Sequence, residues 1–456
     1  MRSSDGLKRS RARKQFQAFR NSGRLLAASG LVDFSVGQTS MVIGAVVVFL
    51  IALILSRFIN WAIYSWAYYS RKIGPWAPAV EGDTRRWSDH LPIFGWFQLR
   101  REVGKTDKHT KRFWLRPLLI ELLFPVCITA YYCLYISGFM LPVTLRSPEA
   151  LASLFVVLHY QFGGHFVLFT LMMIATFIDF DEHSIPDLVT IPGAVIGLVG
   201  ALFAPGWLPC HATPLVGPTS IIELHVGAPG DWPEVLGTST GFILGLAILA
   251  IWGFALLDRV WITRRGLKKA FQYYFAYLVR RRKIWLTVLI VTWAMMLMTC
   301  LAYRYAYDGR WPVLLSSLIG MAAAAGITWG VRVSASVGLG VEALGFGDVT
   351  LMAMIGTYIG WQPSLLVFFI APLVAVLIVL VRWVITRETV TPYGPYLCAA
   401  TVIILVGWDF IWFNWAAKFF SLGPTIGGII VACVALMGVM LWIWRLIKQA
   451  LGIAGH

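Results

Sequence analysis

The sequence predicts an all-α protein, a polytopic integral membrane helical bundle with about eleven transmembrane helices. Hydrophobic residues make up 58% of its 456 residues, and mean hydropathy is +0.73. Charged residues make up only 13%, whereas soluble domains carry about 25%. So few charges cannot cover a water-facing surface, which excludes both a soluble globular protein and a disordered chain.

Apolar runs long enough to cross about 30 Å of hydrocarbon recur along the chain. One run is marginal in length, and counting it gives eleven spans. The expected spans are residues 41–63, 116–140, 151–178, 188–205, 236–257, 284–306, 312–333, 348–361 (the marginal one), 363–384, 395–415 and 424–446.

The net charge of +16, from 38 basic and 22 acidic residues, indicates topology rather than a nucleic-acid partner. Basic residues concentrate in loops 66–115 and 258–283, whereas loop 206–235 has none. The positive-inside rule therefore places the two basic loops in the cytoplasm, against anionic lipid, and loop 206–235 outside. Eleven spans also place the basic residues 1–24 outside. Either this tail lies on the outer surface, or residues 41–69 form a hairpin.

Cysteine spacing supports neither a zinc site nor a disulfide framework. None of the six cysteines forms a C-x-x-C pair, and loop 66–115 contains none. A structural zinc site generally needs four Cys or His ligands, and this loop offers only His90 and His109. We therefore expect no metal and no zinc cofactor.

Acidic residues at the ends of apolar runs are the candidates for chemistry, because charges at membrane depth are costly and usually functional. Asp179 ends the third expected span, and Asp348 follows a Gly-Phe-Gly sequence. The topology places both at the same membrane face. Two carboxyl groups in one apolar site share a proton, which suits peptide hydrolysis. Composition alone leaves this open against a pair of solvated boundary acids.

The residues around the two acids have simpler interpretations. Gly345 and Gly347 lack side chains, so they permit unusual dihedrals and close approach of a substrate backbone. Pro186 fixes a turn after Asp179. For the neighbouring acids Asp181, Glu182 and Asp187, the sequence favours solvated groups at helix ends that need no partner.

Four blocks resemble, in order, the motifs of bacterial type IV prepilin peptidases, which are membrane proteases of the G-x-G-D type. The string I-D-F-D-E-H-S-I-P-D, with Asp179 and Asp187, resembles their first active-site motif. The string E-A-L-G-F-G-D-V-T, with Asp348, resembles the second. The other two blocks are Asp89–Trp96 with Leu99-Arg100 and Arg116–Leu122, and Thr391–Tyr396.

The resemblance implies an intramembrane aspartic endopeptidase of the cytoplasmic (inner) membrane, with Asp179 and Asp348 as its catalytic pair. Its partners would be prepilins or type II secretion pseudopilins with basic leaders, cleaved at the cytoplasmic face. Many members also N-methylate the product with S-adenosylmethionine, an activity that often accompanies a cysteine-bearing loop. That loop lacks cysteine here, so we expect no efficient methyl transfer. The lysine usual two residues after the second aspartate is Thr350.

Six segments are expected from the spans and the resemblance. They are a basic tail (1–40), a first span with its cytoplasmic loop (41–115), the first half of a membrane peptidase core (116–257), an inserted basic loop and extra span (258–311), the second half of the core (312–415) and an extra C-terminal span (416–456).

Two other classes of function remain open. A transporter or channel could relay protons or ions through the same acids, but the acids cluster at one face and no inverted repeat is visible. A catalytically silent membrane scaffold would not need both Asp179 and Asp348.

Overall fold

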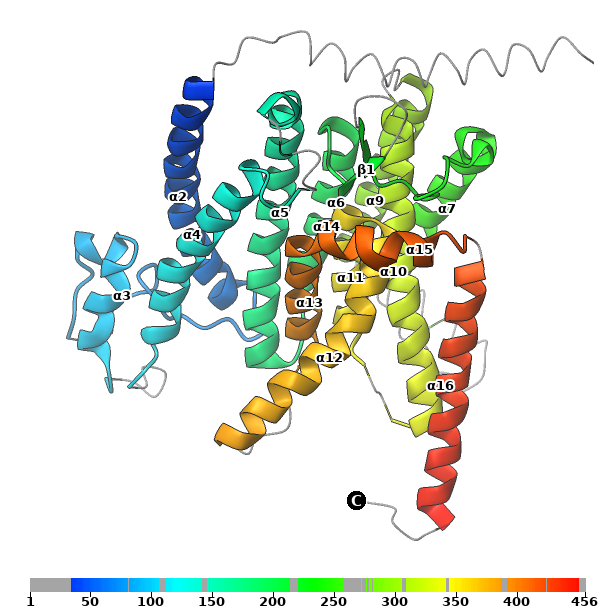
Figure 1. Ribbon diagram of the computed structural model, residues 1–456. Coiled ribbons are helices and arrows are strands. Elements are labelled where there is room, and N and C mark those ends of the chain that lie inside the picture. Colours follow the sequence, from blue (N-terminus) through cyan, green and yellow to red (C-terminus); the bar gives the residue numbers. More distant parts are fainter. Residues whose placement is uncertain are drawn as a thin grey trace, which may run out of the picture.

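The computed structural model describes residues 34–450 with several gaps (Figure 1). The gaps are residues 81, 106–110, 142–145, 147, 214–219, 258–271, 273–275, 277–278, 281, 306–308, 342–343, 387–391 and 424. The expectations for the basic tail, for most of loop 258–283 and for His109 therefore fall outside the described residues.

Long apolar helices dominate the described part of the chain and confirm an all-α polytopic membrane protein. Eight of them are long and apolar enough to cross a membrane. They are α2 (Phe34–Ser65), α4 (Leu115–Ile136), α5 (Pro148–Glu182), α7 (Ser239–Leu256), α9 (Arg282–Tyr305), α10 (Arg310–Leu339), α12 (Trp361–Thr386) and α16 (Thr425–Ala450). The exact count of eleven spans is not confirmed.

Two of the remaining expected spans are short helices, α6 (Asp187–Phe203) and α11 (Phe346–Ile359). At 1.5 Å per residue, α11 extends only about 21 Å, less than the hydrocarbon thickness. It is buried from Asp348 to Ile359. Its backbone meets that of α10 where Gly356 faces Gly320, a close approach that only small residues permit. Helix α11 is therefore the central helix of the bundle.

The expected span 395–415 is not one straight helix. Helix α13 (Gly394–Val406) meets the stretch Trp408–Phe420 at a bend of 79°. That stretch comprises α14 (Trp408–Ile411), the π-helical turn η6 (Trp412–Ala416) and α15 (Ala417–Phe420). The bend falls at Gly407, because glycine is a weak helix former. Trp408 Nε1–H then donates to the Cys210 carbonyl at 3.2 Å, which draws the chain away from the axis of α13.

Loop 206–235 contains elements that the sequence did not predict. Strands β1 (Cys210–Thr213) and β2 (Ser220–Glu223) pair antiparallel, with Cys210 opposite Glu223. Arg310, at the start of α10, forms an ion pair with Glu223 at 3.2 Å. A 3₁₀ turn, η4 (Glu234–Gly237), precedes α7. The ion pair ties the hairpin to the bundle.

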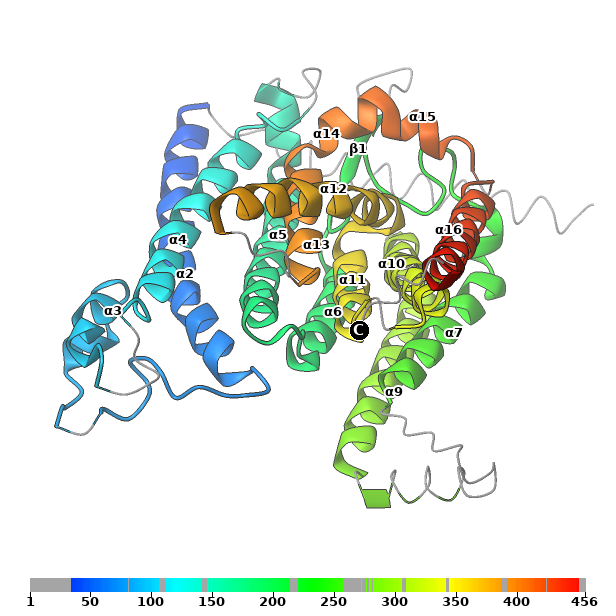
Figure 2. The same cartoon turned by 90° about the horizontal axis from the view of Figure 1, so that it is seen from below.

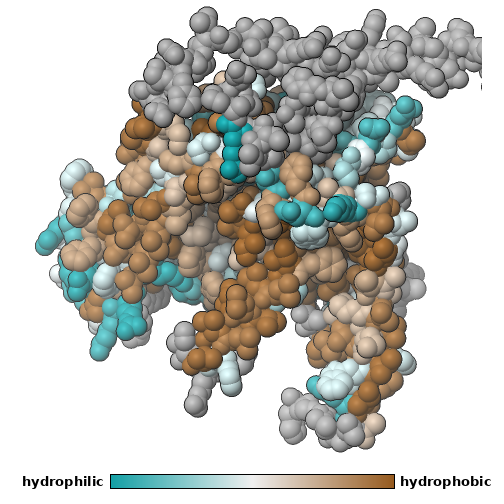
Figure 3. All heavy atoms as spheres, in the orientation of Figure 1, coloured by the Kyte–Doolittle hydropathy of each residue, from teal (hydrophilic) through white to brown (hydrophobic). Residues whose placement is uncertain are grey.

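The described residues of segment 66–114, between α2 and α4, form a small subdomain built from short helical turns. These are η1 (Trp87–His90), α3 (Phe94–Gln98) and η2 (Leu99–Glu102). Hydrophilic residues gather on this part, whereas hydrophobic residues cover the neighbouring long helices (Figure 3). A separate core joins Tyr64 to Ile73, Trp96 and Leu99. Buried Glu121 of α4 accepts hydrogen bonds from the Ile93 N–H at 2.6 Å and from Trp96 Nε1–H at 2.9 Å.

Ion pairs reinforce the subdomain, so it does not depend on packing alone. Arg101 binds Asp83 at 3.0 Å and Asp89 at 2.8 Å, and Arg85 binds buried Glu102. The pKa of Asp83 falls to about 2, chiefly because its carboxylate accepts the Thr84 backbone N–H. The Arg101 guanidinium lowers the pKa of Asp89. Both acids are therefore ionised and paired near neutral pH.

Candidate active site

The fold brings together the two aspartates that the sequence singles out. Asp179 lies in the last turn of α5 and Asp348 in the first turn of α11. Their residues are only 4% and 7% exposed. They are close enough for the charge on one to act on the other. From below, the ends of α5, α6, α11 and α13 gather at the centre of the molecule (Figure 2).

Helix α13 supplies a third component. The backbone N–H of Gly394, its first residue, donates to Oδ2 of Asp179 at 3.1 Å. Helix N-termini carry partial positive charge, so the starts of α11 and α13 both favour a carboxylate here. A Cβ atom on Gly394 would lie 2.5 Å from Oδ2 of Asp179 and 2.8 Å from Cδ1 of Ile185. Glycine is therefore required for this contact. Tyr393 and Cys398 also lie within electrostatic reach of Asp348.

The other motif residues that the sequence singles out lie near the ends of α5, α11 and α13. A Cβ atom on Gly347 would lie 3.1 Å from Cβ of Ile185, so this glycine lets α11 approach the turn after α5. Gly345 has an extended backbone and caps α11. Pro186 is buried and caps α6, whose first residue, Asp187, is exposed.

A strained residue makes the turn after Asp179. His183 has φ of 52°, in the left-handed region, and its backbone N–H donates to the Asp179 carbonyl at 2.9 Å. A non-glycine residue costs about 1–2 kcal/mol in this conformation. The turn ends α5 and directs the chain through Ile185 and Pro186 into α6, which brings Ile185 against Gly347 and Gly394.

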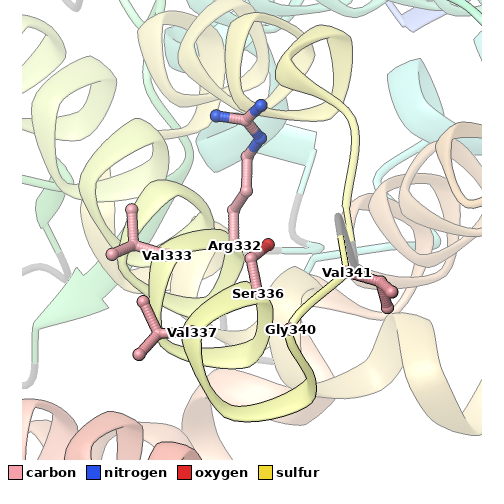
Figure 4. Close-up of a pocket in the computed structure, with 6 residues that line it drawn as sticks. All are labelled: Arg332, Val333, Ser336, Val337, Gly340 and Val341. Carbon is pink, nitrogen blue, oxygen red and sulfur yellow. The ribbon is translucent and has the colours of Figure 1, made fainter. Parts of the chain in front are cut away.

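Arg332 of α10 braces the turn before Asp348. Its Nε–H donates to the Leu344 carbonyl at 2.8 Å, and its guanidinium lies over the Phe346 ring at 5.9 Å. A pocket opens beside this arginine, lined also by Val333, Ser336, Val337, Gly340 and Val341 (Figure 4). Neither aspartate lines it. Thr350, where the resembling family has lysine, is buried and donates to the Gly347 carbonyl at 3.0 Å.

The interpretation of Asp181 and Glu182 as solvated acids without partners is wrong. Arg116 of α4 binds both carboxylate oxygens of Asp181, at 2.7 and 2.8 Å. Glu182 accepts the backbone N–H groups of Tyr68 and Tyr69 at 2.8 and 2.9 Å. Sequence blocks could have found Arg116 and Gly394, since both fall within strings that resemble family motifs. Nothing in the sequence pairs Arg116 with an acid 65 residues away.

The described residues of loop 66–115 offer no set of side chains suited to zinc. Among the described residues of the protein, no three His, Cys, Asp or Glu side chains come together as metal ligands. The loop has no cysteine, and its Asp83, Asp89 and Glu102 are engaged by arginines.

Comparison with known proteins gives a family match for the part of the chain that contains Asp348. The family description "Type IV leader peptidase family" matches residues 283–380, which contain Asp348 and the glycines before it but not Asp179. The matched segment, residues 283–380 of 456, is similar to the type IV leader peptidase family. This similarity, together with the long apolar helices, supports a membrane peptidase of the aspartic type. No curated protein and no solved structure shows a significant match to the chain.

Proposed function

We propose that the protein is a leader peptidase that uses Asp179 and Asp348 as its catalytic pair. The observation that carries the proposal is the meeting of two nearly buried carboxyl groups at the ends of α5 and α11, within reach of each other's charge. Two such groups cannot both ionise readily, so one keeps a proton. The ionised group takes a proton from water, and the protonated group donates a hydrogen bond to the scissile carbonyl.

The proposed substrate is a prepilin or pseudopilin, with a basic leader followed by glycine and an apolar helix. Such a chain lies with its helix in the bilayer and its leader at the membrane surface, so the scissile bond comes at the membrane boundary. A catalytic pair at helix ends matches that depth. The proposed face is cytoplasmic, since the basic subdomain 66–114 contacts the same end of α5 through Tyr68, Tyr69 and Arg71.

The test is cleavage in proteoliposomes that contain the purified protein and a synthetic substrate of this form. We expect a single cut after the glycine, identified by the masses of both products. A matched substrate whose apolar helix is interrupted by lysines should resist cleavage. Equal cleavage of both substrates, or no cleavage of either, would contradict the proposal.

Sidedness is tested by single cysteines in a background without the native ones. Lys72→Cys in the basic subdomain and Glu234→Cys before α7 are both at exposed positions. An impermeant maleimide added outside intact cells should label Glu234→Cys but not Lys72→Cys. The reverse pattern would place the site on the outer face.

For cofactors, we propose that cleavage needs neither zinc nor S-adenosylmethionine. The ion pairs of Arg101 and Arg85 stabilise the subdomain where relatives often use metal. Elemental analysis should find no stoichiometric zinc, and a chelator should leave cleavage unchanged. With labelled S-adenosylmethionine, most of the mature product should lack an added methyl group. Stoichiometric zinc or a mostly methylated product would contradict this.

A further inference from the structure

The last turn of α5 concentrates negative charge at the C-terminus of the helix. Asp179, Asp181 and Glu182 lie within four residues at the C-terminus of a helix, where the helix dipole already disfavours negative charge. Like charges so closely spaced repel one another. Without compensation, this turn, which contains Asp179, should fray.

Two sets of contacts from outside α5 compensate those charges. Arg116 of α4 makes a bidentate ion pair with Asp181. Arg71 lies 3.6 Å from the same carboxylate. The side chain of Asp181 is 18% exposed and that of Arg116 is 33% exposed. Planar bidentate pairs between arginine and a carboxylate fix the orientation of both side chains as well as compensating the charge. Glu182 meanwhile accepts two successive backbone N–H groups from residues 68 and 69.

Two aromatic rings position the Arg116 side chain. Its guanidinium lies over the rings of Tyr64 at 5.7 Å and Phe177 at 5.5 Å. Five residues further along α4, buried Glu121 anchors the subdomain through Ile93 and Trp96. One helix therefore connects the subdomain to the turn that contains Asp179; α4 packs beside α5 (Figure 1).

We infer that Arg116 and Asp181 are positioning residues, which hold the last turn of α5 so that Asp179 faces Asp348. This inference rests on the proposed catalytic role of the two aspartates. Asp181 does not enter the reaction; its ion pair fixes the backbone that bears Asp179. The subdomain thus acts on catalysis through α4 rather than through a metal.

The ionisable surroundings of Asp179 allow a specific test of charge. They are Asp348 of α11, Cys398 of α13, Tyr393 before α13, His183 in the turn, Glu182 of α5, Asp187 at the start of α6, Tyr64 of α2, Arg71 of the subdomain, and the Arg116–Asp181 pair. The test variants alter only the Arg116–Asp181 pair, so every other group in these surroundings stays constant.

The experiment compares Arg116→Gln, Asp181→Asn and the double variant by the pH dependence of cleavage. Each single variant should lower kcat about 10- to 100-fold with little change in KM, the scale of loss when a reacting group is misplaced. Arg116→Gln leaves an extra negative charge beside Asp179, which favours protonation. The acid limb of the profile of kcat against pH should therefore move to higher pH. Asp181→Asn leaves an extra positive charge and should move it lower, each by about half a unit. In the double variant the limb should return towards the wild type. Lys72→Gln, an exposed change in the subdomain next to Arg71, is the control.

Hydrogen exchange at residues 177–183 provides a readout independent of cleavage, and both single variants should exchange faster than the wild type there. Should Asp181→Asn or Arg116→Gln not accumulate in the membrane, Asp181→Glu and Arg116→Lys replace them. These variants keep the charges but not the bidentate geometry, so kcat should fall by less, exchange should still be faster, and the acid limb should stay near that of the wild type. If the wild type cleaves and the variants share its kcat and acid limb, the inference is wrong. Reduced stability of Arg116→Gln or Asp181→Asn with an unmoved acid limb also overturns it. If the wild type cleaves no leader substrate, the proposed function fails, and the exchange data still decide whether the pair holds the turn.

Discussion

The backbone N–H of Gly394 donates to the carboxylate of Asp179 at 3.1 Å, across 215 residues of sequence. This contact joins the end of α5 to the start of α13. Asp179 and Asp348 also lie close enough for the charge on one to act on the other. Three helix ends therefore define the site, and each contributes either a carboxyl group or a backbone donor to it.

Replacing Gly394 with alanine should abolish most cleavage. The new Cβ atom would lie 2.5 Å from Oδ2 of Asp179, so the aspartate or α13 must move. A misplacement of about 1 Å at a reacting group costs about 100-fold in rate. The measurement is kcat for leader cleavage at equal amounts of membrane-inserted protein. Gly427→Ala on α16, where no atom lies within 4 Å of the new Cβ, should retain wild-type activity. Equal activity of both variants would show that Asp179 does not need this contact.

Arg332→Lys should reduce cleavage while keeping the charge. Lysine cannot supply both the Nε–H bond to Leu344 and the planar contact over Phe346. The turn before Asp348 should loosen, and we expect kcat to fall about tenfold, since a displaced catalytic group loses rate steeply. Hydrogen exchange at residues 344–350 should rise in parallel. A fall in kcat without faster exchange would point to a role for Arg332 outside this turn.

Acid should open the subdomain in a pH window set by Asp83 and Asp89. Their pKa values are lower in the folded protein than the unfolded value of about 3.9. Their contribution to stability is therefore complete above about pH 4 and is lost as pH falls towards about 2. Hydrogen exchange at residues 83–102 should rise in that window. Arg101→Gln should move the rise to higher pH, whereas Lys111→Gln, an exposed change, should not. If the rise in exchange occurs at the same pH in Arg101→Gln as in the wild type, groups other than Asp83 and Asp89 cause the acid sensitivity.

The sequence was sufficient to predict most of the long helices and to single out the two aspartates that the fold brings together, for a physical reason. Twenty apolar residues have few alternatives to a membrane helix, and acids such as Asp179 and Asp348 are conspicuous at the ends of such runs. Short-range signals also marked Pro186 and the glycines before Asp348, because their roles depend on local dihedrals.

Contacts between distant segments could not be predicted in the same way. The pairing of Arg116 with Asp181 depends on how α4 packs against α5, and the sequence favoured a solvated Asp181 instead. The bend at Gly407 depends on a hydrogen bond from Trp408 to the β1 strand. A lone glycine in an apolar run does not reveal such a partner. The ion pairs of the subdomain were equally hidden, because only the fold places Arg101 between Asp83 and Asp89.

The most direct test of the central claim is cleavage of a leader substrate by Asp179→Asn and Asp348→Asn in proteoliposomes. Asparagine keeps the size of each side chain but can neither hold nor accept the shared proton. Both variants should insert normally and lose cleavage by several orders of magnitude, as expected when either member of a catalytic unit is removed. Asp187→Asn, at an exposed position, should have a milder effect. Near-wild-type cleavage by either Asp179→Asn or Asp348→Asn would contradict the two-aspartate site.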